Sequence, residues 1–424
     1  MNLNIASKAK GLRPKKFTFL AYLAALGPGL IAANAGNDAG GVITYASAGS
    51  QYGYKPLFFM VLVTVGLIVV QEMSARLGTF SGKGLASLIR EEFSIRMTAL
   101  AMTALTVTNL GLVVSEFAGI GASFGLFGVS RYISIPIAAV AIWALVLLGS
   151  YKYAERIFLI LSLAFFAYPV AAIISHPSVS TVASNLVVPH FIFSKSYIYL
   201  AVGLIGTTIS PYMQLYAASG VVDRGVKPEE YALERFDAVG GAIFADVISI
   251  FMIIATAAVI GGTGPLASAH QAASALRPVA GSFDVYLFAA GLLGASALAA
   301  AVVPLSTSYA LAEAIGYERS ISSSFRDAPV FVGIFTTQIV IGAGIALLPS
   351  NLITFLVFAQ VLQGLVTPII LAFILKLANK RSILGDRANT PAFRTVATIV
   401  VASISILSLV LLVQSVLGWF HIGG

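Results

Sequence analysis

Cysteine and charge are both scarce in this sequence. None of the 424 residues is Cys, so disulfide bonds and thiolate metal sites are excluded. Charged residues make up 10% of the chain, against about 25% in a typical soluble domain. Hydrophobic residues make up 58%, and the mean hydropathy is +0.94. A chain of this length with so few charged residues cannot form a surface that is exposed to water throughout, so we predict an integral membrane protein.

Sequence patterns of common enzyme and nucleotide-binding sites are also missing. There is no nucleophile elbow, no P-loop and no dinucleotide fingerprint. The histidines lie in or near loops that are predicted to be outside, so we do not expect them to form a zinc site. We therefore expect a protein that is not an enzyme and has no resident cofactor, no nucleic-acid partner and no obligate protein partner. The histidines are His176, His190, His270 and His421.

The hydrophobic residues occur in long continuous runs. A helix needs about 20 apolar residues to cross the hydrocarbon core, whereas barrel strands read as alternating segments of about 10 residues. The runs predict an all-α membrane protein, with a basic arm over 1–17 and a single transmembrane domain over 18–424. The predicted spans are 18–46, 54–77, 97–127, 132–149, 153–175, 197–219, 236–262, 283–316, 328–347, 351–378 and 393–418.

The basic residues favour one side of these spans. With a cytoplasmic N-terminus, nearly all of the 25 Lys and Arg fall at cytoplasmic ends, which is the bias typical of inner loops. With eleven spans this predicts a C-terminus outside the cell membrane. Two longer outside loops, 176–196 and 261–283, are expected to be structural covers. The basic residues predicted to be outside are Lys55, Arg131, Lys195 and Arg277.

Two of the predicted spans are interrupted in the middle. The first holds Asn34–Gly41, rich in Asn and Gly, and the sixth holds Gly206–Tyr212, which includes Pro211. The two spans are five helices apart, so they run in opposite directions. Such a pair is typical of inverted five-helix repeats with a binding site near the bilayer midplane. A simple proline kink remains an alternative for the sixth span.

Asp38 is the candidate that anchors this site. A carboxylate at the bilayer centre costs at least ~2.5 kcal/mol, and such groups are functional by default. Neighbouring glycines permit the helix to unwind, which exposes backbone carbonyls that bind a cation together with the carboxylate. The alternative is an ion pair with a Lys or Arg of another helix, but no predicted span has one near its middle.

Other polar residues in the spans extend this prediction. Glu116 and Asp246 are interpreted as proton or ion relays, or as protonated groups with hydrogen bonds to neighbours. Gln360 and, less strongly, Gln363 are either cation ligands or interhelical hydrogen-bonding groups. The predicted metal-binding set is Asp38, Ala35, Gly41, Thr207, Ser210 and Gln360, and the predicted pathway or supporting set is Glu116, Asp246, Asn37, Tyr212 and Gln363.

Several motifs resemble one known family. Gly27-Pro28-Gly29 followed by Asp38-Ala39-Gly40-Gly41, and above all Gln71-Glu72-Met73-Ser74-Ala75-Arg76-Leu77-Gly78, are similar to helices 1 and 2 of the NRAMP divalent metal transporters. The resemblance runs from about residue 20 to the end. It implies a LeuT-like fold, with inverted repeats of helices 1–5 and 6–10 plus an eleventh helix.

The departures from this family are chemically informative. Where the family has Asn and Met as metal ligands, this chain has Gly41 and Ser210, and the family's two helix 6 histidines are replaced by Tyr212 and Ala217. Loss of a soft thioether removes the bias toward transition metals, and a glycine is expected to leave room for a partly hydrated Mg²⁺. The pattern resembles the NRAMP-related magnesium transporters and implies weak or absent proton coupling.

Three functions therefore remain open. The first is an Mg²⁺ (and Mn²⁺) transporter without strong proton coupling. The second is a proton-coupled Mn²⁺/Fe²⁺ carrier that tolerates a changed site. The third is a Na⁺-coupled carrier of organic solutes, although Asp38 would repel a substrate carboxylate. A sensor is disfavoured because the sequence shows no soluble output domain.

Overall fold

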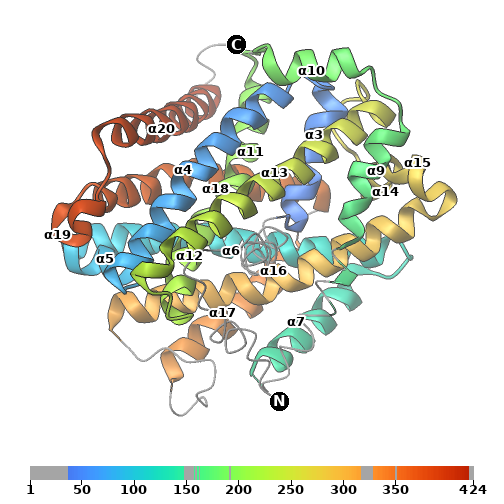
Figure 1. Cartoon of the computed structure of the whole chain (residues 1–424). Helices are drawn as coiled ribbons and strands as arrows, with labels where there is room; N and C mark the ends of the chain where they lie inside the picture. The colour runs from blue at the N-terminus through green and yellow to red at the C-terminus, as the bar shows by residue number, and fades with distance from the viewer. Residues whose placement is uncertain are drawn as a thin grey trace, which may run out of the picture.

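The computed structural model describes residues 37–147, 157, 160–161, 163–190, 192–316, 328–348 and 351–419. Every regular element within these ranges is helical, as the apolar runs predict (Figure 1). The longer helices are α3 (Ala39–Tyr52), α4 (Leu57–Ser81), α6 (Ile95–Gly125), α7 (Arg131–Leu147), α11 (Lys195–Thr208), α12 (Pro211–Asp223), α13 (Tyr231–Ile260), α16 (Asp284–Ile315), α17 (Pro329–Ala346), α18 (Leu352–Ala378) and α20 (Pro391–Trp419).

Eight helices in the described ranges are long and apolar enough to cross a membrane. A ninth results if the helical stretches Leu163–Ile174 and Val179–Val187, which meet at 115°, are one bent span. Eight of the eleven predicted spans correspond to these eight helices. Of the other three, the first is described only from Asn37 onward, the fourth is the shorter helix α7, and the fifth (153–175) overlaps the bent pair. The rest of the first span, the basic arm and Ala35 lie outside the described residues.

Short helices occupy the connections between the spans. The loop predicted over 176–196 contains α10 (Val179–Val187), and the loop predicted over 261–283 contains α14 (Ala269–Ala273) and α15 (Arg277–Ala280). The remaining short helices are α5 (Leu85–Glu92), α9 (Ala167–Ile174) and α19 (Arg381–Leu384).

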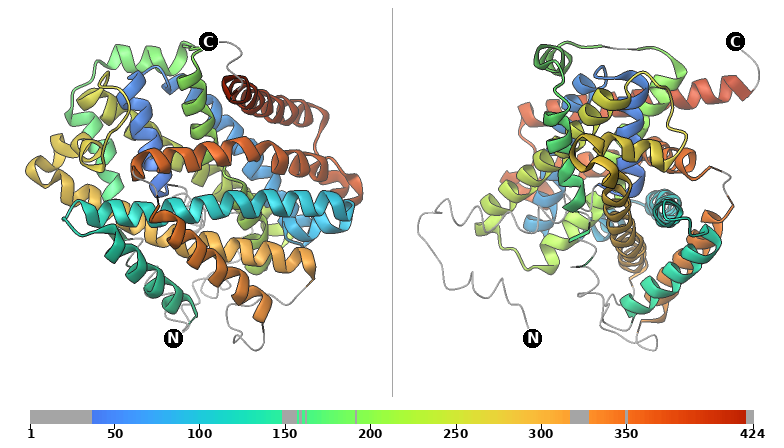
Figure 2. Two further views of the ribbon diagram at one scale, coloured as in Figure 1. Left: turned by 180° about the vertical axis from the view of Figure 1, so that it is seen from behind. Right: turned by 90° about the vertical axis from the view of Figure 1, so that its right-hand side faces the viewer.

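The long helices pack in two groups. In the first group α13 packs against α3 and α4, and α4 also packs against α12. In the second, α6 packs against α16, α17 and α18, and α11 contacts α18. Figures 1 and 2 show α3 and α4 running across α6, α16 and α18. Every residue of α3 from Ala39 to Ser50 is buried, so its N-terminal end lies inside the protein between the two groups.

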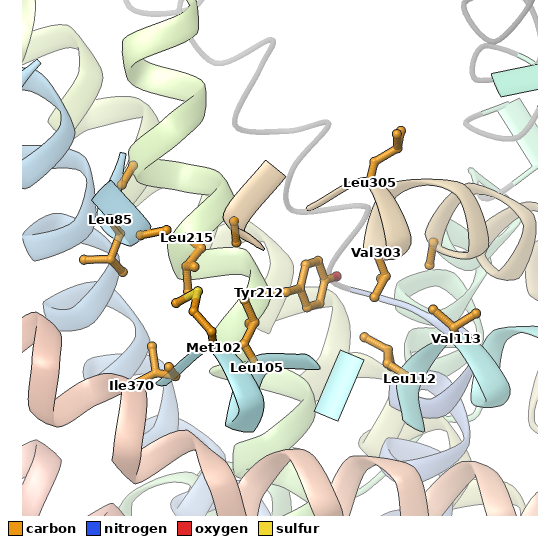
Figure 3. Packing of buried hydrophobic residues seen from close by; sticks show 14 of the residues in the cluster. Leu85, Met102, Leu105, Leu112, Val113, Tyr212, Leu215, Val303, Leu305 and Ile370 are labelled. Carbon is orange, nitrogen blue, oxygen red and sulfur yellow. The ribbon is translucent and has the colours of Figure 1, made fainter. Parts of the chain in front are cut away.

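Two apolar clusters form the core. The larger joins α4, α6, α16, α17 and α18, and the smaller joins α3 to α9, α13 and α16. Figure 3 shows part of the larger cluster, where Tyr212 lies among Leu105, Leu112 and Val303. The start of α12 is therefore held against α6 and α16 by apolar packing. This fixes the position of the break that precedes α12.

Candidate metal-binding site

The sixth span is broken, as its sequence predicts. α11 ends at Thr208, and Ile209 (φ −113°, ψ 53°) and Ser210 (φ −63°, ψ 134°) leave the helical conformation before α12 starts at Pro211. A proline is tolerated at this first position because its missing N–H would be unpaired in any case. These dihedral angles show a discontinuity rather than a kink in a continuous helix.

Hydroxyl groups lie beside the carbonyls that this break exposes. Ser210 Oγ donates to Gly206 O at 2.7 Å and lies 3.2 Å from Thr207 O. Thr367 of α18 contacts Ile209 O at 3.4 Å. Because its proton points to its own backbone, the Ser210 oxygen keeps lone pairs that are able to bind a cation.

Asp38 caps the N-terminus of α3. Its backbone is extended (φ −65°, ψ 171°), and its carboxylate accepts a hydrogen bond from Gly41 N at 2.6 Å. The carboxylate also accepts from Gln360 Nε2 at 3.0 Å, although α18 is far away in the sequence. Asp38 is 1% exposed, and among the described residues no Lys or Arg forms an ion pair with it. The helix N-terminus is its main source of positive charge here.

A second carboxylate reaches the same helix end. Glu116 of α6 accepts from Ala39 N at 3.3 Å and is fully buried, while its Oε1 has no hydrogen-bond partner. α6 approaches α3 closely because of Gly119, where an added Cβ would lie 2.5 Å from the Cβ of Ala39. The two acids thus share one helix terminus.

Glycines allow Gln360 to reach Asp38. A Cβ on Gly40 would overlap the Gln360 side chain, and a Cβ on Gly206 would overlap its carbonyl. Gln360 Nε2 is occupied by Asp38, while Gln360 Oε1 is buried without a partner. The amide oxygen is therefore the part of Gln360 that is able to bind a cation.

The region around Gly41 differs from our expectation. We expected open volume at this glycine, but a Cβ there would overlap Thr207 Oγ1 and lie 3.1 Å from Asp38 Oδ1. The expectation was wrong for this conformation, because the missing side chain lets α11 move close to α3. Thr207 Oγ1 is itself buried without a hydrogen-bond partner. It is thereby placed within reach of a cation bound at Asp38.

Ser115 is a further candidate that the sequence analysis did not find. Its hydroxyl is buried without a hydrogen-bond partner and would lie 2.9 Å from a Cβ on Gly40. A serine next to Glu116 was the available signal, but only the packing of α6 on α3 brings it to the site. Four unpartnered oxygens thus surround the α3 terminus, on Thr207, Ser115, Glu116 and Gln360.

The remaining predicted residues lie around this centre or away from it. Asn37 Oδ1 accepts from Ser249 of α13 at 3.1 Å. Tyr212 is buried at the start of α12. Gln363 is fully buried, and neither of its side-chain polar atoms has a hydrogen-bond partner. Asp246 lies on α13 and makes no hydrogen bond to Asp38 among the described residues.

Two cavities lie at opposite ends of α13. The larger, of about 420 Å³, extends from Tyr212 to Asp223 and Glu234 between α4, α12, α13 and α16. The smaller, of about 200 Å³, is lined by Ser47 and Leu266, among others. Asp38 lines neither of these two cavities.

The donor set consists of oxygen atoms. It offers a carboxylate, an amide oxygen, hydroxyls and helix-end carbonyls. In the described ranges, no group of three or more His, Cys, Asp or Glu side chains is arranged to hold a metal ion. Oxygen donors suit hard cations such as Mg²⁺ and Mn²⁺, whereas thioether and thiolate groups favour softer metals. The geometry therefore supports binding of a hard divalent cation.

A protein-family model matches most of this chain. The model described as natural resistance-associated macrophage protein-like matches residues 29–414. The chain belongs to the NRAMP family. It is 27% identical to the divalent metal cation transporter MntH of Aeromonas hydrophila, over 93% of this chain and 96% of that protein. MntH of Klebsiella pneumoniae is also 27% identical, over 93% and 95% of the two chains.

Solved structures confirm the fold of this NRAMP protein. A mutant of the manganese transporter of Eremococcus coleocola matches with a TM-score of 0.73 and 18% identity, covering 97% of this chain and 91% of that one. A nucleobase-cation-symport-1 family transporter matches with a TM-score of 0.56 and 14% identity, covering 91% and 89%. The predicted LeuT-like fold is confirmed, and a family of transporters agrees with the expectation that the chain is not an enzyme.

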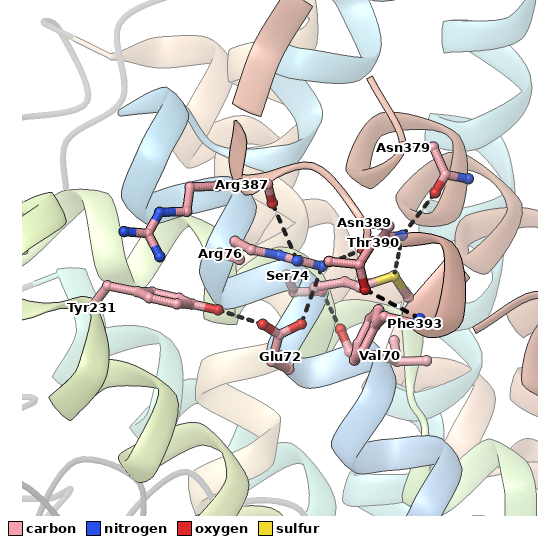
Figure 4. Close-up of polar contacts among 11 residues, drawn as sticks. Val70, Glu72, Ser74, Arg76, Tyr231, Asn379, Arg387, Asn389, Thr390 and Phe393 are labelled. Carbon is pink, nitrogen blue, oxygen red and sulfur yellow. Dashed lines mark hydrogen bonds and ion pairs between the residues drawn. The ribbon is translucent and has the colours of Figure 1, made fainter. Parts of the chain in front are cut away.

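A buried polar network lies in the C-terminal half of α4 (Figure 4). Arg76 and Glu72, 8% and 5% exposed, form an ion pair at 3.2 Å. Arg76 also donates to Arg387 O at 3.2 Å and to Asn389, while Tyr231 donates to Glu72. The network ties α4 to the start of α13 and to the segment between α18 and α20. The motif of α4 was recognisable from the sequence, but these partners were not.

Proposed function

We propose that this NRAMP protein moves divalent cations into the cytoplasm by alternating access, with Mg²⁺ as the preferred substrate and Mn²⁺ as a second one. The observation that carries this proposal is the donor set at Asp38, whose hydrogen-bond partners are the Gly41 amide and the Gln360 side chain. Oxygen donors dominate the surroundings, and no sulfur atom contacts the carboxylate among the described residues. Such a set does not select transition metals over Mg²⁺.

The unpartnered oxygens around Asp38 support a hydrated ion. Mg²⁺ dehydrates reluctantly and usually keeps several waters. Buried polar groups without protein partners are the groups that such waters bind. Thr207, Ser115 and Glu116 each offer one such oxygen beside α3. Asp38 and Gln360 would then contact the ion, while the other oxygens hold its remaining waters.

Proton coupling is proposed to be weak. The helix 6 positions that carry histidine in the resembling family hold Tyr212 and Ala217 here. Neither side chain is a proton acceptor near neutral pH. The orientation proposed from the basic residues, with a cytoplasmic N-terminus and the C-terminus outside, places the larger cavity on the cytoplasmic side.

A sulfur substitution tests the selectivity. We expect Ser210→Met to shift the ratio of Mn²⁺ or Cd²⁺ uptake to Mg²⁺ uptake upward in proteoliposomes, because a thioether favours softer metals. Ser210→Ala is the matched control, since it also removes both hydroxyl contacts but adds no sulfur. An equal ratio in the two variants would refute the argument from ligand softness.

A second candidate is a proton-coupled Mn²⁺ carrier. It is favoured by the names of the relatives, which are divalent metal cation and manganese transporters. A competition assay of metal uptake separates the two functions. Mg²⁺ should inhibit Mn²⁺ uptake, when both are present at comparable millimolar concentrations, only if Mg²⁺ is itself a substrate.

A further inference from the structure

Asp246 is a buried acid that the metal site does not use. It lies halfway along α13 and is 2% exposed, and its Oδ2 has no hydrogen-bond partner. Among the described residues no Lys or Arg forms an ion pair with it. An ionised carboxylate in such a place carries a large desolvation penalty. It therefore requires either a bound cation or a proton.

Polar groups close to Asp246 are few. Thr64 of α4 is the hydrogen-bonding neighbour of Asp246. Thr64 Oγ1 donates its hydrogen to Met60 O at 2.8 Å. A hydroxyl has one hydrogen, which Thr64 Oγ1 is able to donate either to Met60 O or to Asp246. In the described ranges no cluster of acids or histidines forms a metal-binding group that includes Asp246, so a proton is the charge that compensates this carboxylate.

Tyr45 lies between Asp246 and the end of α11. Tyr45 of α3 interacts electrostatically with Asp246, and its hydroxyl lies 2.9 Å from Thr208 Oγ1 at the end of α11. One turn along α13, Ser249 bonds to Asn37, the residue before Asp38. Movement of α3 relative to α13 therefore changes the surroundings of Asp246, although Asp246 is no ligand of the metal site.

Few other titratable groups face this position. The elements packed against α13 include α3, α4 and α9. On α3 the titratable groups are Tyr45 and Tyr52, which ends the helix, and on α9 the titratable group is the fully buried Tyr168. The charged residues of α4, Glu72 and Arg76, lie at least two turns beyond Thr64 in the network of Figure 4.

Asp246 is also closed off from both cavities. The larger cavity reaches Gly241 on the same helix, five residues away, and Asp246 lines neither cavity. A proton on Asp246 is thus enclosed in this conformation. Exchange with water requires α13 or its neighbours to move, as they must when a transporter of this fold changes its accessible side.

We propose that Asp246 is a proton-binding site of the transport cycle, separate from the metal site at Asp38. An O–H bond forms when the carboxylate takes a proton from hydronium on one side. That bond breaks when the proton is returned to water after the conformational change. This inference rests on the proposed transport function. Helix 6 lacks the histidines of the family, so the weak proton coupling is assigned to Asp246 instead.

Asp246→Asn tests this in the full-length protein. Uptake of Mg²⁺ and Mn²⁺ is measured in proteoliposomes across a pH series, with a trapped pH dye, and metal binding is measured by calorimetry. We expect wild-type uptake to follow a one-proton titration and to change the internal pH. Asp246→Asn should bind metal as wild type does, with a flat pH profile and no metal-driven pH change. Glu91→Gln, an exposed acid, is the charge-matched control and should behave as wild type.

Several outcomes would overturn the proposal. An Asp246→Asn protein with the wild-type pH profile would show that the carboxyl is permanently protonated, and one that no longer binds metal would place Asp246 in the metal site. Wild-type uptake that is independent of pH would also refute it. If Asp246→Asn does not fold, Thr64→Val provides the test, since removing the hydroxyl that contacts Asp246 must shift the pH profile. Failure of the transport function itself would appear differently, as absence of metal uptake by the wild type.

Discussion

Replacing Asp38 separates its structural role from its role in metal binding. Asp38→Asn keeps an oxygen acceptor for the Gly41 amide, which lies 2.6 Å from the present carboxylate. Asn is about as good an N-cap as Asp, whereas Ala at such a position costs ~1 kcal/mol. Asp38→Ala also leaves the Gln360 amide buried without its acceptor, which adds about 1–3 kcal/mol. We therefore expect Asp38→Asn to be about as stable as wild type and Asp38→Ala to melt clearly lower.

Metal binding should vanish in both variants. A ligand present at 100 times its dissociation constant stabilises the folded state by about 2.7 kcal/mol. Melting of the purified protein with and without Mg²⁺ or Mn²⁺ should show this stabilisation for wild type and for neither Asp38 variant. Uptake into proteoliposomes should fall to the background of empty liposomes. Metal-dependent stabilisation or robust Mg²⁺ uptake by Asp38→Asn would refute the assignment of the site.

Two further predictions concern the packing that supports the site. Gly206→Ala should destabilise the protein by about 1–3 kcal/mol, because the new methyl group would overlap the α18 backbone. Gly220→Ala, in open space, should be neutral or stabilising by up to ~1 kcal/mol. Arg76→Gln should lower the free energy of unfolding by about 3–5 kcal/mol, because it leaves Glu72 buried without its partner. Lys83→Gln, which removes one member of an exposed ion pair, should lower it by under ~1 kcal/mol. Melting temperatures check both comparisons, and equal losses within either pair would contradict the reasoning.

Features that depend on local sequence were predictable. Continuous apolar runs predicted the spans, since only helices satisfy their backbone in lipid over such lengths. The break before α12 followed from Pro211 and its flanking polar residues. Asp38 stood out because a carboxylate in an apolar span requires compensation. These conclusions required no knowledge of which helices are neighbours.

Features that depend on packing between distant segments were not predictable. The contact of Gln360 with Asp38 requires α18 to lie against both Gly40 and Gly206. The space expected at Gly41 is closed because α11 approaches α3, which the substitution alone did not reveal. The partners of Arg76 come from segments far along the chain. Sequence reasoning identified the types of donor but not their arrangement.

Mg²⁺ uptake by the wild-type protein in proteoliposomes, measured with and without a proton gradient, tests the central claim most directly. The account predicts Mg²⁺ uptake without an imposed gradient, a modest response to the gradient, and inhibition of Mn²⁺ uptake by Mg²⁺ at comparable millimolar concentrations. Mn²⁺ uptake that needs a proton gradient and is unaffected by Mg²⁺ would contradict it.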